Sequence, residues 1–195
     1  DSSLIGKSIE LHFEGVYHNS SIFVNSKLAG NERYGYTAFD VDITDLVRVG
    51  ENHICVKVDN SLEPNCRWYS GSGIYRTVQL VIREPNHIID VHIDTVQIRP
   101  AQISISVHTA EVCPVSVYIY DGDKRVVSGT PGVLTVPDAK LWSDENPFLY
   151  KAVIKTDTDQ REFMFGVRLL RWDAQNGITV NGQRVLFRGG CIHHD

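Results

Sequence analysis

The feature that most constrains the fold is a two-residue alternation of apolar and polar side chains, repeated in many short runs. In residues 9–13, Ile, Leu and Phe alternate with Glu and His. The same period recurs at residues 22–24, 54–58, 78–82, 103–107, 115–119 and 163–167. Successive side chains of a β-strand point to opposite faces of the sheet, so each run predicts a strand. Gly, Asn, Asp, Ser or Pro residues separate the runs, which is typical of an all-β sandwich.

Helical signals are almost absent. The best candidate is a single turn over residues 44–47, with Thr44 or Asp45 as its N-cap. Near the end of the chain, Asn181-Gly182 separates two alternating runs, which is the strongest short signal for a two-residue β-hairpin.

The segment after this hairpin carries the most suggestive side chains. An apolar run at residues 185–187 predicts a strand, and Arg-Gly-Gly then leads to His193, His194 and Asp195. Titratable groups delivered to the end of a strand indicate one wall of an active site. A metal site made of these three residues is disfavoured, because adjacent residues on a strand point to opposite faces. The plain alternative is that they are ordinary residues at a strand end.

Composition limits the function classes. The 195 residues suffice for one or two domains, each with its own core. Hydrophobic residues make up 42% and charged residues 22%, an ordinary globular balance. The net charge of −5 and the lack of a basic patch argue against nucleic-acid binding. No apolar run approaches the roughly 18 residues of a membrane span.

The cysteines argue against metal and redox chemistry. Cys55, Cys66, Cys113 and Cys191 show no Cys-x-x-Cys spacing, so zinc and thioredoxin-like sites are disfavoured. Cys55 and Cys113 lie in apolar runs, where we expect small buried hydrophobic side chains. The cysteines do not fix the redox compartment, and cytoplasmic, periplasmic and secreted locations all stay open.

Two aromatic segments stand out within the strand pattern. Residues 67–76 read Arg-Trp-Tyr-Ser-Gly-Ser-Gly-Ile-Tyr-Arg. Flat aromatic faces beside a guanidinium suit a sugar ring, although the residue types alone favour Trp68 and Tyr69 as caps of a sandwich core. Residues 141–150 read Leu-Trp-Ser-Asp-Glu-Asn-Pro-Phe-Leu-Tyr, and there we expect Trp142 and Phe148 to fill a core. Asn146-Pro147 is a turn signal.

Together these segments resemble glycoside hydrolase family 2, the group of β-galactosidases, β-glucuronidases and β-mannosidases. Residues 67–76 resemble the end of the family's sugar-binding jelly roll, and residues 141–150 resemble a signature of its immunoglobulin-like domain. Residues 165–168, 180–183 and 187–195 are similar to the entry into its catalytic (β/α)8 barrel. The resemblance implies three parts: residues 1–84 as part of the jelly roll, 85–168 as an immunoglobulin-like β-sandwich, and 169–195 as the start of the truncated barrel. The polar, Pro-containing residues 83–87 and the break in the strand pattern over residues 168–175 fit these boundaries.

The resemblance also implies where sugar binds. His193 matches a family histidine near the bound sugar at the mouth of the barrel, where (β/α)8 chemistry is located. His194, Asp195, Arg67 and Trp68 complete the expected substrate-binding set. Some family members place an acidic residue at the position of Cys66, so Arg67 is the substitute donor here.

The two glutamates that catalyse hydrolysis in the family would lie beyond Asp195. We therefore expect no catalytic residue in this chain, and we expect the chain to be the inactive N-terminal portion of a retaining β-glycosidase, most simply a β-galactosidase. β-Glucuronidase and β-mannosidase are the alternatives within the family. Outside it, a carbohydrate-binding module or a structural β-sandwich pair would leave the terminal histidines without a role.

The resemblance implies a carbohydrate substrate, and a homo-oligomer because family members commonly form dimers or tetramers. The residues indicate no cofactor, no bound metal, no nucleic-acid partner and no membrane span. A divalent or monovalent cation in the full-length enzyme stays open.

Overall fold

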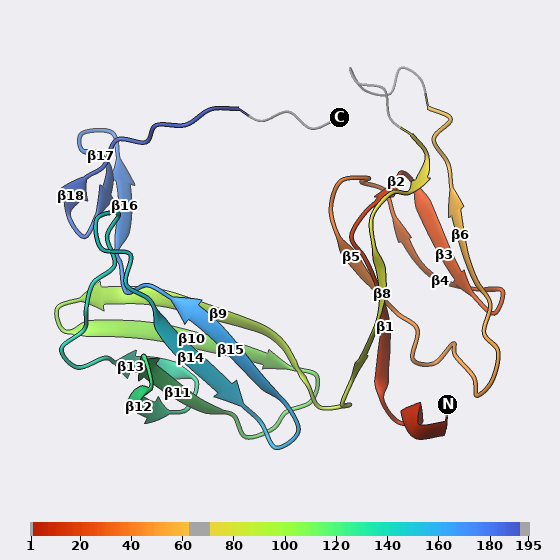
Figure 1. Cartoon of the computed structure of the whole chain (residues 1–195), viewed down its shortest axis with the longest axis horizontal. Helices are drawn as coiled ribbons and strands as arrows, with labels where there is room; N and C mark the ends of the chain where they lie inside the picture. Colours follow the sequence, from red (N-terminus) through yellow and green to blue (C-terminus); the bar gives the residue numbers. More distant parts are fainter. Residues whose placement is uncertain (1, 63–70, 192–195) are drawn as a thin grey trace. The chain divides into compact units, whose positions relative to one another are not determined.

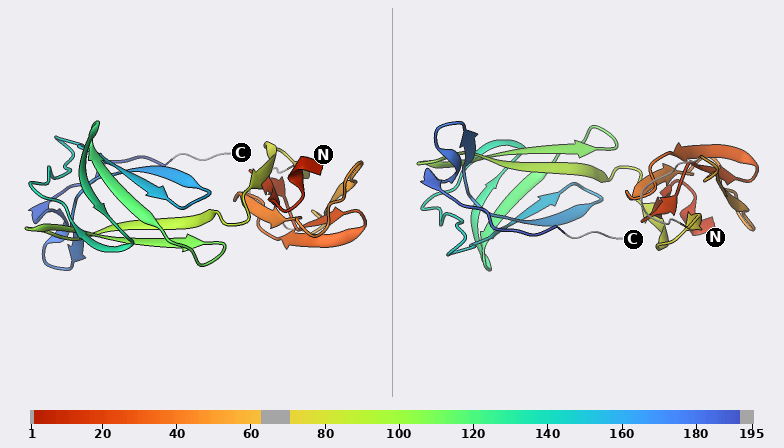
Figure 2. Two further views of the ribbon diagram at one scale, coloured as in Figure 1. Left: turned by 90° about the horizontal axis from the view of Figure 1, so that it is seen from below. Right: turned by 90° about the horizontal axis from the view of Figure 1, so that it is seen from above.

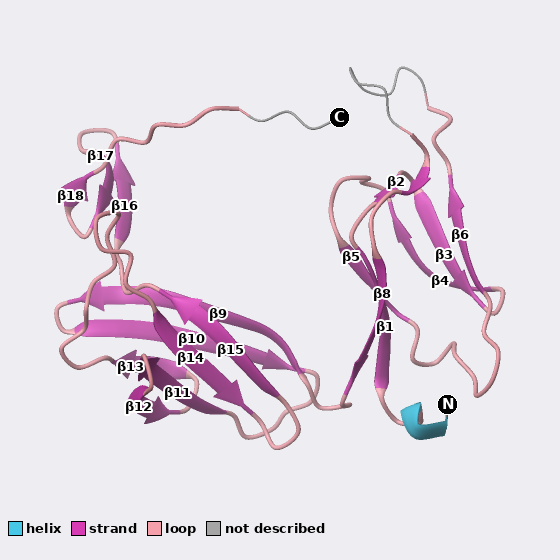
Figure 3. Ribbon diagram, in the orientation of Figure 1, coloured by secondary structure: helices cyan, strands magenta, loops and turns pink. Residues whose placement is uncertain are grey.

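The computed structural model describes residues 2–62 and 71–191 (Figure 1). In this part of the chain the regular elements are β-strands, apart from the 3-10 turn η1 (Ser2–Leu4) (Figure 3). The prediction of an all-β fold is confirmed. None of the described residues forms a helix with the length and apolarity of a membrane span. The chain divides into two compact units, which we call the first unit (Asp1–Pro85, with Cys191–Asp195) and the second unit (Asn86–Gly190).

The first unit is built from three small antiparallel sheets. Two three-stranded sheets have the orders β5-β1-β8 and β4-β3-β6, and β2 pairs with β7. The strands are β1 (Ser8–Phe13), β2 (Val16–Tyr17), β3 (Ser20–Val24), β4 (Lys27–Glu32), β5 (Phe39–Asp42), β6 (Ile54–Val58), β7 (Gly73–Ile74) and β8 (Val78–Arg83).

The core of the first unit lies between the two larger sheets. Ile9, Leu11 and Phe13 alternate along β1 and are buried, and Ile22 and Val24 on β3 meet them from the other sheet. The alternation seen in the sequence thus divides β1 into a buried apolar face and a polar outer face. Burial of each such side chain contributes about 1.5–3 kcal/mol.

Among the described residues, one side of this core is left exposed. The apolar side chains of the edge strand β8 pair across the ladder with the buried residues of β1, so both sets point to the same face. Nevertheless Val78, Leu80 and Ile82 are 39%, 55% and 42% exposed. Ile54, on the edge strand β6 of the other sheet, is also exposed. We call these four residues the open face.

The second unit begins with a two-layer sandwich, whose layers face each other in Figures 1 and 2. One sheet has the order β13-β10-β9 and the other β12-β11-β14-β15, and all pairs are antiparallel. The strands are β9 (Ile88–Ile98), β10 (Ala101–Thr109), β11 (Ser116–Asp121), β12 (Lys124–Gly129), β13 (Gly132–Thr135), β14 (Tyr150–Lys155) and β15 (Gln160–Phe165).

The core between these layers is closed. Ile103 and Ile105 from β10 face Val117 and Ile119 from β11, and each is almost completely buried. Phe148 packs against this cluster, as predicted. Trp142 is half-buried and lies beside Gly166, where an added Cβ would come within 2.8 Å of its side chain.

A three-stranded antiparallel sheet follows the sandwich, with β16 (Leu170–Asp173), β17 (Gly177–Val180) and β18 (Gln183–Arg184) in the order β16-β17-β18. β17 and β18 pair through Val180 and Gln183, so Asn181 and Gly182 form a two-residue turn. Both have positive φ angles, +53° and +83°, as the type I′ turn requires. The hairpin predicted at Asn181-Gly182 is confirmed.

Two smaller predictions hold only in part. Residues 44–46 form a single turn, in which the Val47 N–H donates to the Ile43 carbonyl at 3.1 Å. Its cap is Asp42 and not Thr44 or Asp45, because the Asp42 carboxylate accepts the Thr44 N–H at 2.9 Å. Thr44 instead bonds β1, because its hydroxyl accepts the Ile9 N–H. Cys55 is exposed, since it points to the outer face of the edge strand β6, whereas Cys113 is half-buried.

Candidate functional site

The residues predicted to bind sugar lie outside the described part of the chain. They are Arg67, Trp68, His193, His194 and Asp195, and Cys66 lies there too. The structure therefore describes the frame around these positions and not their contacts.

The described ends of the segment that carries Arg67 and Trp68 are held together. The Asn60 side-chain amide donates to the Ser72 hydroxyl at 2.9 Å. β7 then pairs with β2 through Val16 and Ile74. These bonds hold the described residues on either side of the segment close together.

Asp59 shapes the first of these ends. Its carboxylate accepts the Ser61 hydroxyl at 2.5 Å and the Ser61 N–H at 3.0 Å. These two hydrogen bonds favour the ionised form, so they lower the pKa of Asp59 below its usual 3.8. Asp59 is thus a turn-forming carboxylate.

Four tyrosines gather beside this closure, and we call them the tyrosine cluster: Tyr17, Tyr34, Tyr36 and Tyr75. The rings of Tyr17 and Tyr36 meet edge to face with centroids 5.2 Å apart, and those of Tyr34 and Tyr36 with centroids 5.8 Å apart. The Tyr75 hydroxyl donates to the Gly35 carbonyl at 2.7 Å, which places Tyr75 beside the other three.

The tyrosine cluster was missed in the sequence, where the segment that contains Tyr75 was noted for its aromatic residues but Tyr17 and Tyr34 were not. The available signal was the repeat Tyr34-Gly35-Tyr36, in which two rings flank a residue without a side chain. The pairing with Tyr75 joins residues 40 positions apart and depends on the tertiary fold.

In the second unit, Asn181 fixes the terminal hairpin to the sandwich. Its side-chain oxygen accepts the Leu169 N–H at 2.9 Å, and its side-chain amide donates to the Trp142 carbonyl at 2.9 Å. Its backbone N–H donates to the Leu169 carbonyl. One residue of the type I′ turn therefore holds both the 141–150 segment and the chain that enters β16.

The strand expected at residues 185–187 is not formed. Val185 donates one backbone hydrogen bond to the Ile178 carbonyl, and the chain then runs to Cys191 without further regular structure. Leu186 and Phe187 are exposed. A parallel barrel strand needs a neighbouring strand to complete its hydrogen bonds, and the described residues offer none here.

A polar groove of about 760 Å³ lies between this hairpin and the 141–146 loop. Its lining includes Arg99, Asp144, Glu145 and Arg184, so charges of both signs border it. Asp144 and Glu145 are exposed, which agrees with the turn expected there.

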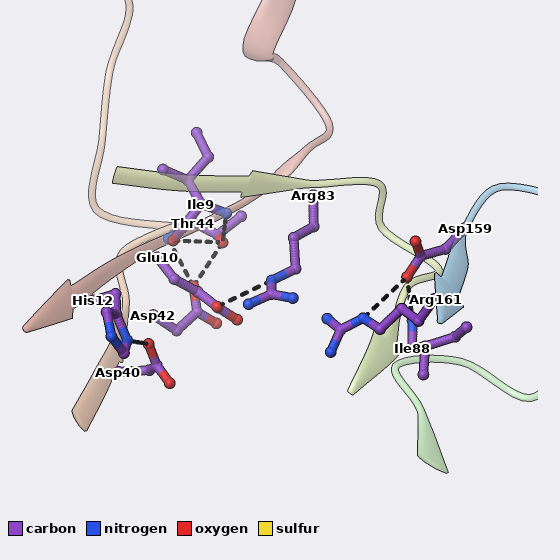
Figure 4. A network of polar contacts seen from close by, with 10 residues as sticks. All are labelled: Ile9, Glu10, His12, Asp40, Asp42, Thr44, Arg83, Ile88, Asp159 and Arg161. Atoms are coloured by element: carbon purple, nitrogen blue, oxygen red, sulfur yellow. Dashed lines mark hydrogen bonds and ion pairs between the residues drawn. The ribbon is translucent and has the colours of Figure 1, made fainter. Parts of the chain in front are cut away.

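The acidic side chains shown in Figure 4 form hydrogen bonds or ion pairs with neighbouring residues. In the first unit, Asp40 Oδ1 lies 2.7 Å from His12 Nδ1, and Glu10 lies 3.4 Å from Arg83 Nε. In the second unit, Asp159 accepts the Ile88 N–H at 2.8 Å. Glu10 is partly buried and pairs with Arg83.

The described residues also lack a metal centre, since no group of three or more His, Cys, Asp or Glu side chains among them could hold an ion.

In the turn between β16 and β17, the Asn176 and Gln175 N–H groups donate to Asp173 and lower its pKa below the usual 3.8. Its carboxylate, like that of Asp59, serves a turn.

Comparisons with known proteins agree with this arrangement. A family model described as "Glycosyl hydrolases family 2, sugar binding domain" matches residues 1–85, and a second, "Glycosyl hydrolases family 2", matches residues 78–168. The chain is 34% identical to a putative β-glucuronidase of Formosa agariphila over 97% of its length, which is 20% of that protein. It is 32% identical to a β-galactosidase of Bacteroides ovatus over its full length, or 26% of that protein.

Solved structures give the same result. The chain superimposes on a glycosyl hydrolase family 2 member from Bacteroides cellulosilyticus with a TM-score of 0.80 and 33% identity, covering all of this chain and 31% of that one. A β-glycosidase from Bacteroides vulgatus gives a TM-score of 0.80 at 30% identity. The chain thus spans about a fifth to a third of these relatives.

Proposed function

Because the chain belongs to glycoside hydrolase family 2, we propose that it is the non-catalytic N-terminal portion of a retaining β-glycosidase that acts on terminal β-glycosides. Family membership is the observation that carries this proposal. The relatives matched here are named β-galactosidases and β-glucuronidases, and the match covers 20%, 26% and 33% of the length of three of them.

Retaining hydrolysis needs two carboxyl groups about 5–5.5 Å apart, one as nucleophile and one as acid and base. We propose that neither lies in this chain. In support, Glu10, Asp40 and Asp159 are engaged by basic groups or a backbone N–H, and Asp59 and Asp173 serve turns. Residues 1–84 then form part of a jelly roll, residues 85–168 an immunoglobulin-like sandwich, and residues 169–195 the start of a barrel.

We propose His193 as a contact to sugar hydroxyls at the barrel mouth. His194, Asp195, Arg67 and Trp68 are the further proposed contacts. In support, the hydrogen bond between Asn60 and Ser72 holds together the described residues that flank the segment with Arg67 and Trp68. A hydrogen-bonding role for His193 needs no change of its charge.

For the substrate, we propose a β-galactoside, with a β-glucuronide as the second candidate. The glucuronide is favoured by one specific observation, the 34% identity to a protein named putative β-glucuronidase. A β-mannoside is the weaker alternative.

The test is turnover of nitrophenyl β-galactoside, β-glucuronide and β-mannoside by this chain and by a longer protein that adds a family 2 barrel. We expect turnover by the longer protein alone, with the galactoside preferred. Turnover by the 195-residue chain itself would contradict the proposal. In the longer protein, His193→Ala should lower kcat/KM by about tenfold or more if it contacts the transition state, and Cys113→Ser should leave kcat/KM unchanged.

A further inference from the structure

The terminal sheet of the second unit contains two Asn-Gly pairs. Asn176-Gly177 lies at the turn between β16 and β17, and Asn181-Gly182 forms the turn between β17 and β18. Glycine has no Cβ, so its backbone nitrogen can approach the side-chain carbon Cγ of a preceding asparagine without obstruction. That approach begins deamidation, a reaction that needs water and no enzyme. The surroundings of each pair therefore decide what such a reaction would change.

The reaction at Asn181 would proceed in two balanced steps. The Gly182 backbone nitrogen attacks Asn181 Cγ and forms a new N–Cγ bond, while the Cγ–Nδ2 bond breaks. The side-chain nitrogen leaves as ammonia with the proton that the Gly182 nitrogen gives up. One water molecule then opens the cyclic imide at either of its carbonyls, which yields aspartate or isoaspartate. In isoaspartate the backbone runs through the side-chain carbon.

The folded hairpin holds the Asn181 side chain at both polar ends. Oδ1 accepts the Leu169 N–H at 2.9 Å, and Nδ2 donates to the Trp142 carbonyl at 2.9 Å. Gly182 lies in the turn, outside the paired residues of β17 and β18, so the ladder does not hold its backbone nitrogen. Cyclisation moves Cγ toward that nitrogen and expels Nδ2, so it cannot proceed while both side-chain bonds are in place. These two bonds are therefore the barrier that folding adds.

Neither product can restore both bonds. A carboxylate has no hydrogen to donate to the Trp142 carbonyl, so two oxygens would face each other where an N–H···O bond stood. Isoaspartate also adds a backbone carbon to a turn that two residues close. Deamidation of Asn181 would thus remove the contact that fastens the hairpin to the 141–150 segment.

We propose that Asn181 is a site of spontaneous deamidation whose reaction depends on opening of the hairpin. Its hydrogen bonds suppress the reaction while the hairpin is closed, and reaction in an opened molecule releases the hairpin from the sandwich permanently. The fraction of deamidated Asn181 therefore increases with the time that the hairpin has spent open. This inference goes beyond the proposed function, since it concerns the lifetime of the hairpin and involves no sugar.

Asn176 is the matched internal control, because the same residue type follows it. Its side-chain amide donates to Asp173 Oδ1 and Oδ2 at 3.2 and 3.1 Å, and Asn176 is exposed. These bonds stay within one turn. Deamidation of Asn176 would therefore leave the contacts of Asn181 with the sandwich in place.

The test is incubation of the 195-residue chain at mildly alkaline pH, in native buffer and in concentrated urea, with peptide mass spectrometry of both asparagines. In urea we expect both to react at similar rates, because the dipeptide alone then sets the rate. In native buffer Asn181 should react at least about tenfold more slowly than in urea, because only molecules with an open hairpin react. Gly182→Ala should slow the reaction of Asn181 in urea and leave that of Asn176 unchanged, which identifies the attacking nitrogen.

The consequence is tested with Asn181→Asp, which reproduces one product, and with Asn176→Asp as its control. Repulsion from the Trp142 carbonyl should displace the new carboxylate at position 181, and the Leu169 N–H then loses its acceptor. We expect hydrogen exchange of the Leu169 amide to be about tenfold faster in Asn181→Asp. In Asn176→Asp it should be unchanged.

Equal rates for Asn181 in native buffer and in urea would overturn the proposed role of its hydrogen bonds. Absence of reaction at Asn181 in urea would exclude the site itself, and unchanged protection of Leu169 in Asn181→Asp would exclude release of the hairpin. None of these measurements involves turnover, so their failure is distinguishable from failure of the proposed function.

Discussion

The two units use the same strand pattern and close their cores differently. In the second unit, the apolar residues of β10 and β11 face each other across the sandwich and are almost completely buried. In the first unit, β8 presents an equally regular apolar row, yet Val78, Leu80 and Ile82 stay exposed at the sheet edge. Alternation therefore indicates which side chains share a face, whereas burial depends on whether a second layer covers that face.

The largest expected effect comes from truncating one apolar side chain in the core of each unit and comparing the losses of stability. Ile119→Ala in the closed core should destabilise the second unit by about 2–5 kcal/mol, because it leaves a cavity among packed neighbours. Leu80→Ala on the open face should cost the first unit about 0.5 kcal/mol, because its side chain already contacts water. Urea unfolding followed by resolved NMR signals of each unit would measure both. Similar costs for the two variants would show that the open face is covered in solution.

A smaller effect is expected at the hairpin of the second unit. Asn181→Ala removes the acceptor of the Leu169 N–H and the donor to the Trp142 carbonyl, and it strains a residue at φ +53°. We expect a loss of about 1–3 kcal/mol of local stability. Asn181→Gly keeps the turn conformation and isolates the side-chain contribution.

Hydrogen exchange of the Leu169 and Val180 amides would report this loss. Exchange in β10 serves as the internal reference, because that strand lies in the sandwich. Unchanged protection of Leu169 in Asn181→Ala would mean that Asn181 does not hold the hairpin.

The open face also predicts a difference in self-association. Exposed apolar side chains on an edge strand favour pairing with other chains, and a lysine opposes it. Leu80→Lys should therefore raise the concentration at which the chain associates by about severalfold. Val133→Lys, at an exposed apolar site on β13 in the second unit, is the control and should change it less. Sedimentation velocity over a concentration series would compare the two, and an equal effect would remove the distinction between the units.

The smallest effect concerns pH and should be alike in both units. The pKa values of Asp59 and Asp173 are lowered in the folded state by hydrogen bonds from Ser61 and from Asn176 and Gln175. A lowered folded pKa contributes stability that is present above the unfolded value near 3.8 and is lost as the pH falls through the folded pKa. Ser61→Ala should raise the pKa of Asp59, and carboxyl NMR titration would detect the change. An unshifted Asp59 would show that Ser61 does not set its pKa.

Local rules explain what the sequence predicted well. Asn181-Gly182 forms its turn because only such residues tolerate two successive positive φ angles without strain. The residues of β1 alternate between core and outer face because strand geometry demands it.

The predictions that were wrong or missed concern contacts with segments distant in the sequence, which the local sequence does not specify. Cys55 is exposed because it points outward from an edge strand, and strand order is a property of the whole sheet. The contact between Tyr75 and Gly35 joins segments far apart in the chain. The strand expected at residues 185–187 lacks a partner among the described residues. The expected sugar contacts at residues 67–68 and 193–195 lie outside those residues and stay predictions.

The junction between the units has a consequence for recombination. Glu84 pairs with Lys7 inside the first unit, while the Asn86 carbonyl accepts the Thr158 hydroxyl inside the second. A crossover at the Pro85–Asn86 bond would therefore keep each of these two bonds within one parental segment. A crossover a few residues earlier, before Glu84, would instead separate the Glu84 and Lys7 side chains, so we expect chimaeras joined there to be less stable.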